Sequence, residues 1–343
     1  MKLVEATGDA RTIGRITGEA LREEIREYWE LTNQAARWQT WEGRWPVLRK
    51  TLEREIPLCL EEMEGTAEGA NLPLEMILKI NVPDYGNALD LPHECTNIGF
   101  SEGPDGPIWG KNNDGGEPGK QAPPVARLIR RNDGVPQLNW TFCGMLATID
   151  GFNAEGLAVG HSSVGSVFAQ SDHHVPIRLW AYEGLFRCRT TEEFARHMCA
   201  VPTRGKGYSS LVVDAGGVIC SLESPCPLGQ VRWPEPGETY MNCSNYYQLP
   251  TLSEADRRTP EGKPNAIARA RMLDERFKGG KGGPDIEAMM QALRYHGDPS
   301  ICRHGGPDMS HTEYSMIGLC AERKALFLHD YPCRGGEYTE VQL

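Results

Sequence analysis

The sequence predicts an α+β fold in which two stacked β-sheets are covered by helices. Three observations predict it. The first quarter has helical patterning, many short strand-like runs follow after about residue 95, and helices then alternate with strands to the end of the chain. With 343 residues, of which 39% are hydrophobic, the chain is long enough to bury a core of this size.

Residues 1–94 are predicted to form a helical subdomain. Leu21, Ile25 and Trp29 recur at helical spacing with charged residues between them. Two further helical stretches follow, IPLCLEEMEGTAEGANLP and LPLEMILKIN. The segment holds 11 Lys and Arg against 18 Asp and Glu, and therefore contributes −7 to the net charge of −11. This acidic first quarter is chemically distinct from the rest of the chain.

An antiparallel meander is predicted next, because short β-type runs are separated by Gly, Pro, Asn and Asp clusters. In order, these runs are TNIGFS, PIWGK, VARLIR, QLNWTFC, MLATIDGF and GLAVGHSS. Two helices, PIRLWAYEGLFRC and TTEEFARHMC, and a hairpin, YSSLVVD with GVICSLES, follow. Helices are then predicted over 264–278 and 284–295, and EYSMIGLC with ALFLHDY is predicted as a closing strand pair. The Pro- and Gly-rich stretch at 228–239 is predicted to be a loop.

The composition argues against several functional classes. A net charge of −11 disfavours nucleic acid or an anionic membrane as the main partner. No apolar run reaches the ~18–20 residues of a membrane-spanning helix, and the first residues lack the apolar stretch of a secretory signal. We therefore expect a cytoplasmic protein with no membrane partner, and an oligomer is left open. The 11 scattered cysteines, with no CxxC pair, are expected to be reduced thiols.

Hairpin geometry draws attention to one of these cysteines. A turn centred near residues 104–106 would pair residues whose numbers sum to about 209–210, so that Cys95 faces residues 114–115. This brings Asp114 close to Cys95, with Lys111 nearby, whereas a slip of one residue would move Asp114 to the other face. The alternative interpretation is a buried thiol beside a turn aspartate.

The residues around Cys95 resemble the signature of a known family. Glu94-Cys95-Thr96-Asn97, followed by Gly110-Lys111-Asn112-Asn113-Asp114, is similar to that of the acyl-coenzyme A:6-aminopenicillanic acid acyltransferase family. These are N-terminal-nucleophile enzymes that cleave themselves and are also classed as a cysteine peptidase family. The resemblance extends over nearly the full length, through FNAEGLAV, VVDAGGVICSLES, Cys243-Ser244-Asn245-Tyr246, Arg303 in ICRH, and Thr312.

The resemblance implies a four-layer αββα fold and a zymogen that cuts itself between Glu94 and Cys95. Residues 1–94 would then be a helical pro-segment that remains as a small subunit, and residues 95–343 would be the catalytic core. Cleavage would free the α-amino group of Cys95, whose ordinary pKa of roughly 7.7–8.0 suits a base at neutral pH. Nucleophile and base would thus share one residue.

The resemblance also implies roles for single residues. Cys95 would be the nucleophile, Asp114 would orient the amine, and Asn245 would donate to the oxyanion. Lys111 stands where related acylases that act on bile salts and penicillin V carry Arg, and it would favour the thiolate or bind a substrate carboxylate. Arg303 has the same two roles open to it. The alternative interpretations are a solvated strand-end lysine for Lys111 and a structural ion pair for Arg303.

The implied reaction passes an acyl group from a small-molecule amide or acyl thioester to Cys95, and then to water or an amine. No cofactor is expected, because no phosphate-loop or dinucleotide fingerprint is present. His173-His174 and the Cys302/His304/His311 set lack the four-ligand spacing of structural zinc, so both are predicted to lie in loops and no metal is expected.

Three residues depart from the family pattern: Glu94 replaces the usual Gly, Asn113 the usual Trp, and Tyr246 the usual His. Glycine tolerates the strained backbone that self-cleavage needs, so a glutamate at this position is expected to slow the reaction or prevent it. Glu94 therefore motivates an alternative function, an unprocessed and catalytically silent family member that binds a small molecule or a partner.

Overall fold

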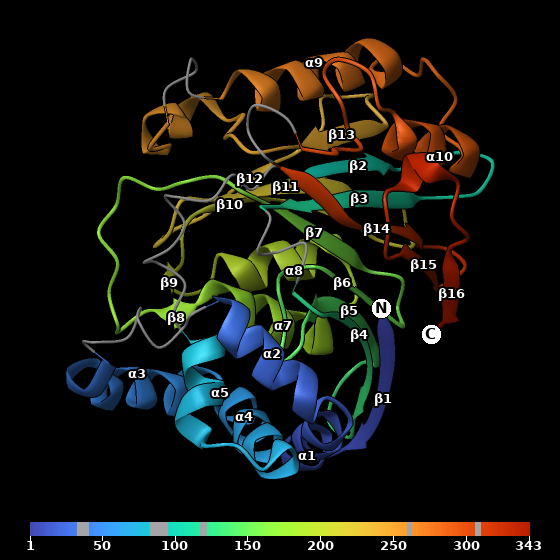
Figure 1. Cartoon of the computed structure of the whole chain (residues 1–343). Coiled ribbons are helices and arrows are strands. Elements are labelled where there is room, and N and C mark those ends of the chain that lie inside the picture. Colours follow the sequence, from blue (N-terminus) through green and yellow to red (C-terminus); the bar gives the residue numbers. More distant parts are fainter. Residues whose placement is uncertain (33–40, 83–94, 117–121, 259–262, 306–309) are drawn as a thin grey trace.

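The computed structural model describes the chain except for residues 33–40, 83–94, 117–121, 259–262 and 306–309. Two β-sheets stack face to face, and helices cover the outer face of each, so the layers follow the order α, β, β, α (Figure 1). The predicted α+β class and αββα layering are confirmed. Within the described ranges, no helix is both long enough and apolar enough to cross a membrane.

The larger sheet has the strand order β1-β4-β5-β6-β7-β10-β11-β12. Its strands are β1 (Lys2–Gly8), β4 (Pro124–Arg131), β5 (Gln137–Phe142), β6 (Gly151–Asn153), β7 (Ala158–Ser163), β10 (Tyr208–Val213), β11 (Ile219–Ser224) and β12 (Gln230–Arg232). The prediction of an all-helical first quarter is wrong at its start, because β1 joins this sheet parallel to β4 and buries Val4 and Ala6 on one face. The prediction of a loop at 228–239 is wrong at β12, which pairs with β11.

The smaller sheet has the strand order β13-β2-β3-β14-β15-β16. Its strands are β2 (Thr96–Phe100), β3 (Ile108–Gly115), β13 (Tyr240–Cys243), β14 (His311–Leu319), β15 (Lys324–Leu328) and β16 (Thr339–Gln342). The predicted meander is therefore divided, because β2 and β3 belong to this sheet and β4 to β7 to the other. Turn residues mark where a strand ends, but they do not specify which sheet the next strand joins. The short strands β8 (Val175–Pro176) and β9 (Thr203–Arg204) pair separately.

The helices are distributed between the two outer layers (Figure 1). The helices on the side of the larger sheet are α1 (Ala10–Ala20), α2 (Arg22–Thr32), α3 (Trp41–Glu55), α4 (Pro57–Ala70), α5 (Leu74–Asn81), α7 (Ile177–Arg187) and α8 (Thr191–Met198). The smaller sheet is covered by α9 (Pro264–Phe277) and α10 (Ile286–Arg294). The helices and the β10–β11 hairpin predicted from the sequence are confirmed. Between the sheets, the rings of Trp109 and Trp140 stack with their centroids 6.1 Å apart.

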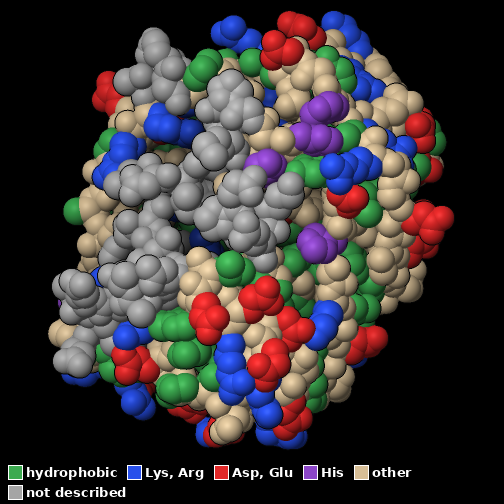
Figure 2. Space-filling model, viewed as in Figure 1, with side chains coloured by type: hydrophobic (Ala, Val, Ile, Leu, Met, Phe, Trp, Pro, Cys, Tyr) green, Lys and Arg blue, Asp and Glu red, His purple; other side chains and the backbone are tan. Residues whose placement is uncertain are grey.

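The N-terminal helices are joined to the core by a buried ion pair. Glu62 of α4 and Arg127 of β4 are both almost fully buried and form a salt bridge, and Tyr182 Oη of α7 donates to Glu62 Oε2 over 2.8 Å. On the surface, acidic and basic side chains alternate over the N-terminal helices, as Figure 2 shows, and Arg11 pairs with Glu64 and Glu68. The described part of residues 1–94 therefore packs as part of the whole fold. The predicted boundary after Glu94 adjoins residues 83–94, outside the described residues.

Helices α1 and α4 approach each other backbone to backbone at glycines. A Cβ atom on Gly14 would lie 2.1 Å from Glu62 O, and one on Gly65 would lie 2.0 Å from Arg11 O. Both distances are far below van der Waals contact and both end on backbone atoms, which have little freedom to move. The close approach of the two helices therefore depends on these glycines.

Replacing Gly65 with Ala is expected to destabilise the protein by about 1–3 kcal/mol, because the added methyl group would force the two helices apart. Helix propensity alone would favour Ala by roughly 0.5–1 kcal/mol, so the sign of the effect is diagnostic. Gly43→Ala is the matched control, because Gly43 is an exposed glycine of α3 with nothing within 4 Å of its added Cβ. Urea unfolding measures both changes. A Gly65→Ala protein as stable as the wild type would contradict this packing.

Candidate active site

Cys95 lies directly before β2, a strand with neighbours on both sides in the smaller sheet. In the β2–β3 pair, Thr96 lies opposite Asn112 and Asn97 opposite Lys111. Continued by one residue, this register places Asn113 opposite Cys95. The predicted pairing with residues 114–115 is therefore wrong by one to two positions. The cause is the turn, which is centred slightly earlier than the Gly and Pro cluster suggests.

This register decides which side chains share a face with the thiol. Alternate residues of a strand point to the same face, so Lys111 and Asn113 lie on the Cys95 side of the sheet. Asp114 shares the opposite face with Asn112, whose amide donates to Leu293 O of α10 over 2.9 Å. The backbone of Asp114 is nevertheless close to the nucleophile candidate, with its carbonyl oxygen 3.9 Å from Cys95 Sγ.

A polar network surrounds the Cys95 sulfur. Cys95 Sγ lies 3.6 Å from Asn113 Oδ1, and Lys111 Nζ donates to that same oxygen over 3.0 Å. Lys111 is fully buried and also donates to both carboxylate oxygens of Asp150 over 2.6 Å. The interpretation of Lys111 as a solvated strand-end lysine is therefore wrong. Its ammonium group contacts the thiol only through Asn113 among the described contacts.

Burial and charge set the protonation of this network. Burial raises the pKa of the Cys95 thiol to about 11, although the nearby Lys111 partly offsets the effect. Burial alone would also raise the pKa of Asp150, but His161 and Lys111 outweigh it and hold this pKa well below its ordinary value. Lys111 and Asp150 thus form a buried ion pair. The thiol is neutral at neutral pH in this arrangement, so reaction requires a base.

Asp114 accepts a hydrogen bond from the neighbouring strand, and the segment before that strand supports the donor. Thr312 of β14 lies opposite Asp114, and its hydroxyl donates to Asp114 Oδ1 over 2.7 Å. The Arg303 backbone N–H donates to the same hydroxyl over 2.9 Å. The position of the Asp114 carboxylate therefore depends on the segment that contains Arg303.

Arg269 of α9 joins Cys95 to Asn245. This buried guanidinium donates from Nη1 to Cys95 O over 2.8 Å and from Nη2 to Asn245 Oδ1 over 3.0 Å. Ser162 Oγ donates to the same Cys95 carbonyl over 3.2 Å. The Asn245 amide donates to Ser163 O over 2.7 Å. The structure thus brings Asn245, from the segment after β13, to the Cys95 region.

Arg303 belongs to the same group through a shared acceptor. Arg303 Nη1 donates to Asn265 Oδ1 over 2.6 Å, and Arg269 Nε donates to that oxygen over 2.7 Å. Arg303 is 4% exposed, so its guanidinium is part of the buried network. The predicted site residues Cys95, Lys111, Asp114, Asn245 and Arg303 are therefore linked by these contacts. Glu94 lies outside the described residues.

Several residues that the structure adds to the site have no predicted role from the sequence. They are Asn113, Asp150, His161, Ser162, Arg269 and Glu313. A signal existed for Arg269, which continues the helical stripe of buried Ala266, Ala270 and Leu273 and is therefore a charged residue at a core position. Asp150, Ser162 and Glu313 belong to segments distant in sequence, and no local pattern connects them with Cys95.

Glu313 extends the network on the side of Asn113. Asn113 Nδ2 donates to Glu313 Oε2 over 2.6 Å, and burial raises the pKa of Glu313 to about 8. The charges of Asp114, Lys111 and Lys206 act on the same carboxyl group. At neutral pH most Glu313 side chains are therefore protonated in the folded protein.

This raised pKa predicts how stability depends on pH. The folded state holds a proton on Glu313 that the unfolded chain, with an ordinary value of 4.5, has already lost above that pH. The stabilising contribution is complete below about pH 4.5 and disappears as the pH rises through about 8. Glu313→Gln mimics the protonated form, so it is expected to reduce this decline by a few kcal/mol, because each pKa unit is worth about 1.4 kcal/mol. Urea unfolding at pH 5 and pH 8 measures it. Equal pH dependence in both proteins would contradict the assignment.

Comparisons with known proteins bear on the fold. No known family model matches the sequence, and no curated protein is recognisably similar to it. A solved mutant of conjugated bile acid hydrolase from Clostridium perfringens superposes with a TM-score of 0.52 and 12% identity, over 73% of this chain and 92% of that one. The Caenorhabditis elegans ortholog of N-acylethanolamine-hydrolyzing acid amidase has a TM-score of 0.49 and 15% identity, over 66% of this chain and 93% of that one. Penicillin V acylase from Agrobacterium tumefaciens has a TM-score of 0.47 and 14% identity, over 68% of this chain and 83% of that one.

At such low identity, similarity establishes the fold and nothing finer. Of these three structures, the bile acid hydrolase has a TM-score above 0.5, and its similarity supports the fold. Membership of the acyltransferase family in particular stays a prediction. The chain has the four-layer αββα fold of N-terminal-nucleophile hydrolases, which confirms the predicted fold class.

Proposed function

We propose that this protein is a self-processing cysteine amidohydrolase or acyltransferase in which Cys95 carries the acyl group as a thioester. The position of Cys95 is the main support. In an N-terminal-nucleophile fold, this buried cysteine directly precedes an interior strand of the smaller sheet, and its sulfur contacts a network that contains a buried ammonium group. The similar bile acid hydrolase structure, a hydrolase by name, is consistent with this reaction class.

Processing would begin with the Cys95 thiol. Its sulfur attacks the Glu94 carbonyl carbon, the peptide C–N bond breaks, and a thioester forms while the nitrogen of Cys95 gains a proton. Water then cleaves the thioester, which leaves a carboxylate on Glu94 and a free thiol and α-amine on Cys95. This supplies the missing base, because an α-amine has an ordinary pKa of roughly 7.7–8.0 whereas the buried thiol has one of about 11.

In turnover, the amine takes the thiol proton and the thiolate attacks the carbonyl of an amide or acyl thioester. The protonated amine then gives its proton to the leaving amine or thiol, and water or an amine acceptor removes the acyl group from Cys95. Asn245 would donate an N–H to the oxyanion, and its carbonyl oxygen is held by Arg269. Asp114, held by Thr312, would orient the amine.

Intact mass and an activity screen test this function together. We expect purified protein to yield fragments of about 10 and 28 kDa from the 38.1 kDa chain, the larger beginning at Cys95. We also expect turnover on a panel of N-acyl amides and acyl thioesters, assayed with and without amine acceptors. A single uncut species without turnover on any compound would contradict the proposal.

A second candidate is an unprocessed binding protein, and two observations favour it. Glu94 replaces the glycine that self-cleavage would favour, and burial keeps the Cys95 thiol protonated. Glu94→Gly separates the two functions. If the catalytic machinery is intact, this variant is expected to cleave at least as fast as the wild type. If both proteins stay uncut and inactive, the binding function stands.

A further inference from the structure

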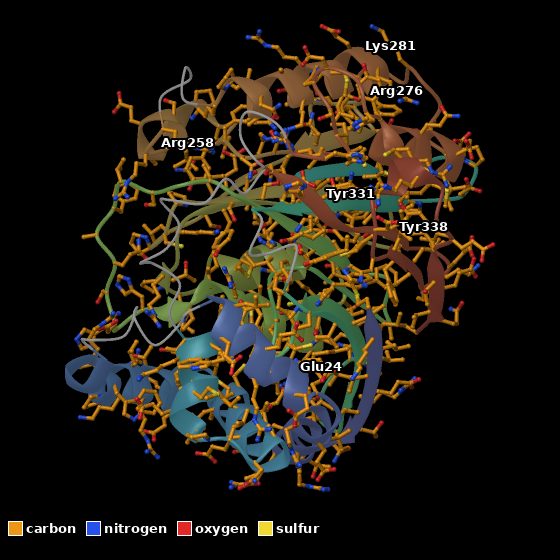
Figure 3. The ribbon with its side chains drawn as sticks, viewed as in Figure 1. Glu24, Arg258, Arg276, Lys281, Tyr331 and Tyr338 are labelled. Atoms are coloured by element: carbon orange, nitrogen blue, oxygen red, sulfur yellow. The ribbon has the colours of Figure 1, made fainter. Side chains whose placement is uncertain are left out.

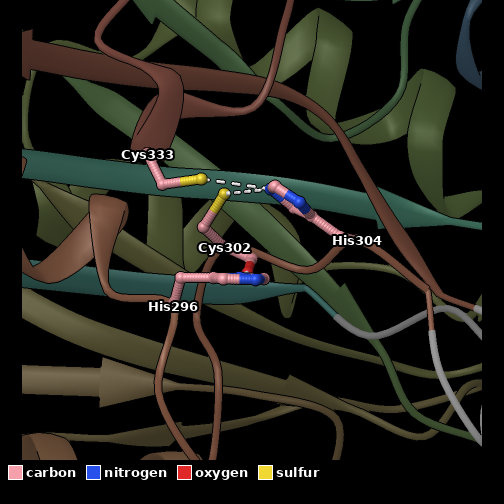
Figure 4. A group of neighbouring side chains, drawn as sticks. All are labelled: His296, Cys302, His304 and Cys333. Atoms are coloured by element: carbon pink, nitrogen blue, oxygen red, sulfur yellow. Dashed lines mark hydrogen bonds between the residues drawn. The ribbon is translucent and has the colours of Figure 1, made fainter.

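A group of four side chains brings two thiols and two imidazoles together, away from the Cys95 thiol contacts. Their candidate ligand atoms all lie within 4.8 Å of one another (Figure 4), and the residues are His296, Cys302, His304 and Cys333. His304 Nε2 lies 3.1 Å from Cys333 Sγ and 3.6 Å from Cys302 Sγ. From the sequence, Cys302, His304 and His311 are considered together as possible metal ligands. Cys302 and His304 belong to this group, whereas His311 Nδ1 lies 3.0 Å from Tyr331 Oη.

We propose that these four residues bind one Zn²⁺ ion in tetrahedral coordination. Two cysteines and two histidines are a ligand set of structural zinc sites. With zinc–sulfur bonds of about 2.3 Å and zinc–nitrogen bonds of about 2.0–2.1 Å, the ligand atoms of a tetrahedron lie about 3.3–3.8 Å apart. The two sulfur–nitrogen distances are close to this range, and all four ligand atoms lie within 4.8 Å of one another. The side chains therefore need to shift by only about 1 Å to coordinate the ion. Binding releases the protons of the two thiols to solvent.

Neighbouring groups already orient the histidine rings. His296 Nδ1 lies 2.7 Å from Cys302 O, and an imidazole that donates from Nδ1 to a carbonyl presents Nε2 to a metal. The Tyr331 ring, labelled in Figure 3, lies against His304 with ring centroids 3.9 Å apart. His296 is exposed and Cys302 is buried, so the group reaches from the surface inward and an ion can enter.

The ligands come from three separate segments, which gives the ion a structural role. His296 follows α10, Cys302 and His304 precede β14, and Cys333 lies in the 3-10 turn Pro332–Arg334 after β15. Arg303, between two ligands, donates its backbone N–H to Thr312, which holds Asp114. The ion would therefore fix the segment on which the position of Asp114 depends. Zinc binding itself does not depend on the proposed catalytic function.

The test uses the full chain, reduced and stripped of metal with a chelator. With Zn²⁺ alone, titration against a chromophoric chelator is expected to show one bound equivalent and a raised melting temperature. Co²⁺ in its place is expected to give the thiolate charge-transfer and visible bands of a tetrahedral site. Cys333→Ser and His296→Ala are each expected to weaken zinc binding by at least about 100-fold. Removal of a residue that only hydrogen-bonds to a ligand typically weakens binding by no more than about that factor. His296 is exposed, so its variant tests the site even if Cys333→Ser fails to fold.

Two control proteins define the outcome. Cys199→Ser, which removes an exposed cysteine elsewhere, and Cys95→Ser are both expected to bind Zn²⁺ as the wild type does. Loss of activity in Cys95→Ser with normal zinc binding separates this proposal from the proposed function. The proposal is overturned if the wild type binds no zinc, if His296→Ala binds it equally well, or if Cys302 and Cys333 form a disulfide that excludes the metal.

Discussion

Replacing Cys95 with Ala is expected to abolish both cleavage before residue 95 and acyl transfer. The substitution removes the sulfur that attacks the carbonyl in both reactions, and no other group at this position can form the thioester. Loss of a catalytic nucleophile lowers kcat on the order of 10⁶-fold in a well-studied hydrolase. Intact mass measures the cleavage, and turnover on the amide and thioester panel measures the transfer.

Cys243→Ala is the matched control for this variant. Cys243 is another fully buried cysteine, lies opposite Asn97 in the strand next to β2, and contacts Ser209 O. Its loss is expected to cost some stability but to leave cleavage and turnover in place. If Cys95→Ala retained turnover, the assignment of the nucleophile would be wrong.

Replacing Asp150 with Asn is expected to destabilise the protein by roughly 3–5 kcal/mol, the usual cost of removing one partner from a buried ion pair. The carboxylate accepts both hydrogen bonds from Lys111 and one from the His161 backbone N–H. Without its charge, the fully buried ammonium of Lys111 has no compensating anion among its described contacts. Urea unfolding at pH 7 measures the loss.

Two comparisons sharpen this result. Lys111→Met combined with Asp150→Leu removes both charges and is expected to recover much of the stability, because apolar residues can replace a buried ion pair. Glu322→Ala removes one partner of the solvent-exposed pair with Lys324 and is expected to leave stability almost unchanged. A loss in Asp150→Asn no larger than that in Glu322→Ala would contradict the buried pair.

Prediction of the fold from the sequence succeeded where the signals are local. Helical patterning located α2 and α4, and two adjacent strand-like runs located the β10–β11 hairpin, since these elements depend on neighbours a few residues away. It failed for β1, which depends on a partner strand more than 120 residues later. It also omitted β16, a four-residue edge strand whose exposed residues lack a hydrophobic pattern.

The candidate site divides in the same way. Cys95, Lys111 and Asp114 could be associated because one hairpin connects them, although the register was wrong and Asn113 is the residue opposite Cys95. Asp150 and Arg269 could not be associated with the site from the sequence, because their contacts to Lys111 and Cys95 come from another sheet and another layer. The candidate metal ligands His296 and Cys333 were missed for the same physical reason, since they approach Cys302 only after the chain has folded.

Trapping the acyl-enzyme tests the central claim most directly. Purified protein is mixed with an excess of a substrate found in the panel, quenched in acid to preserve a thioester, and analysed by intact mass and peptide mapping. We predict one acyl group per chain, on the Cys95 sulfur, that hydroxylamine removes and that Cys95→Ala lacks. An acyl group on another residue, or turnover without any adduct at Cys95, would contradict the account.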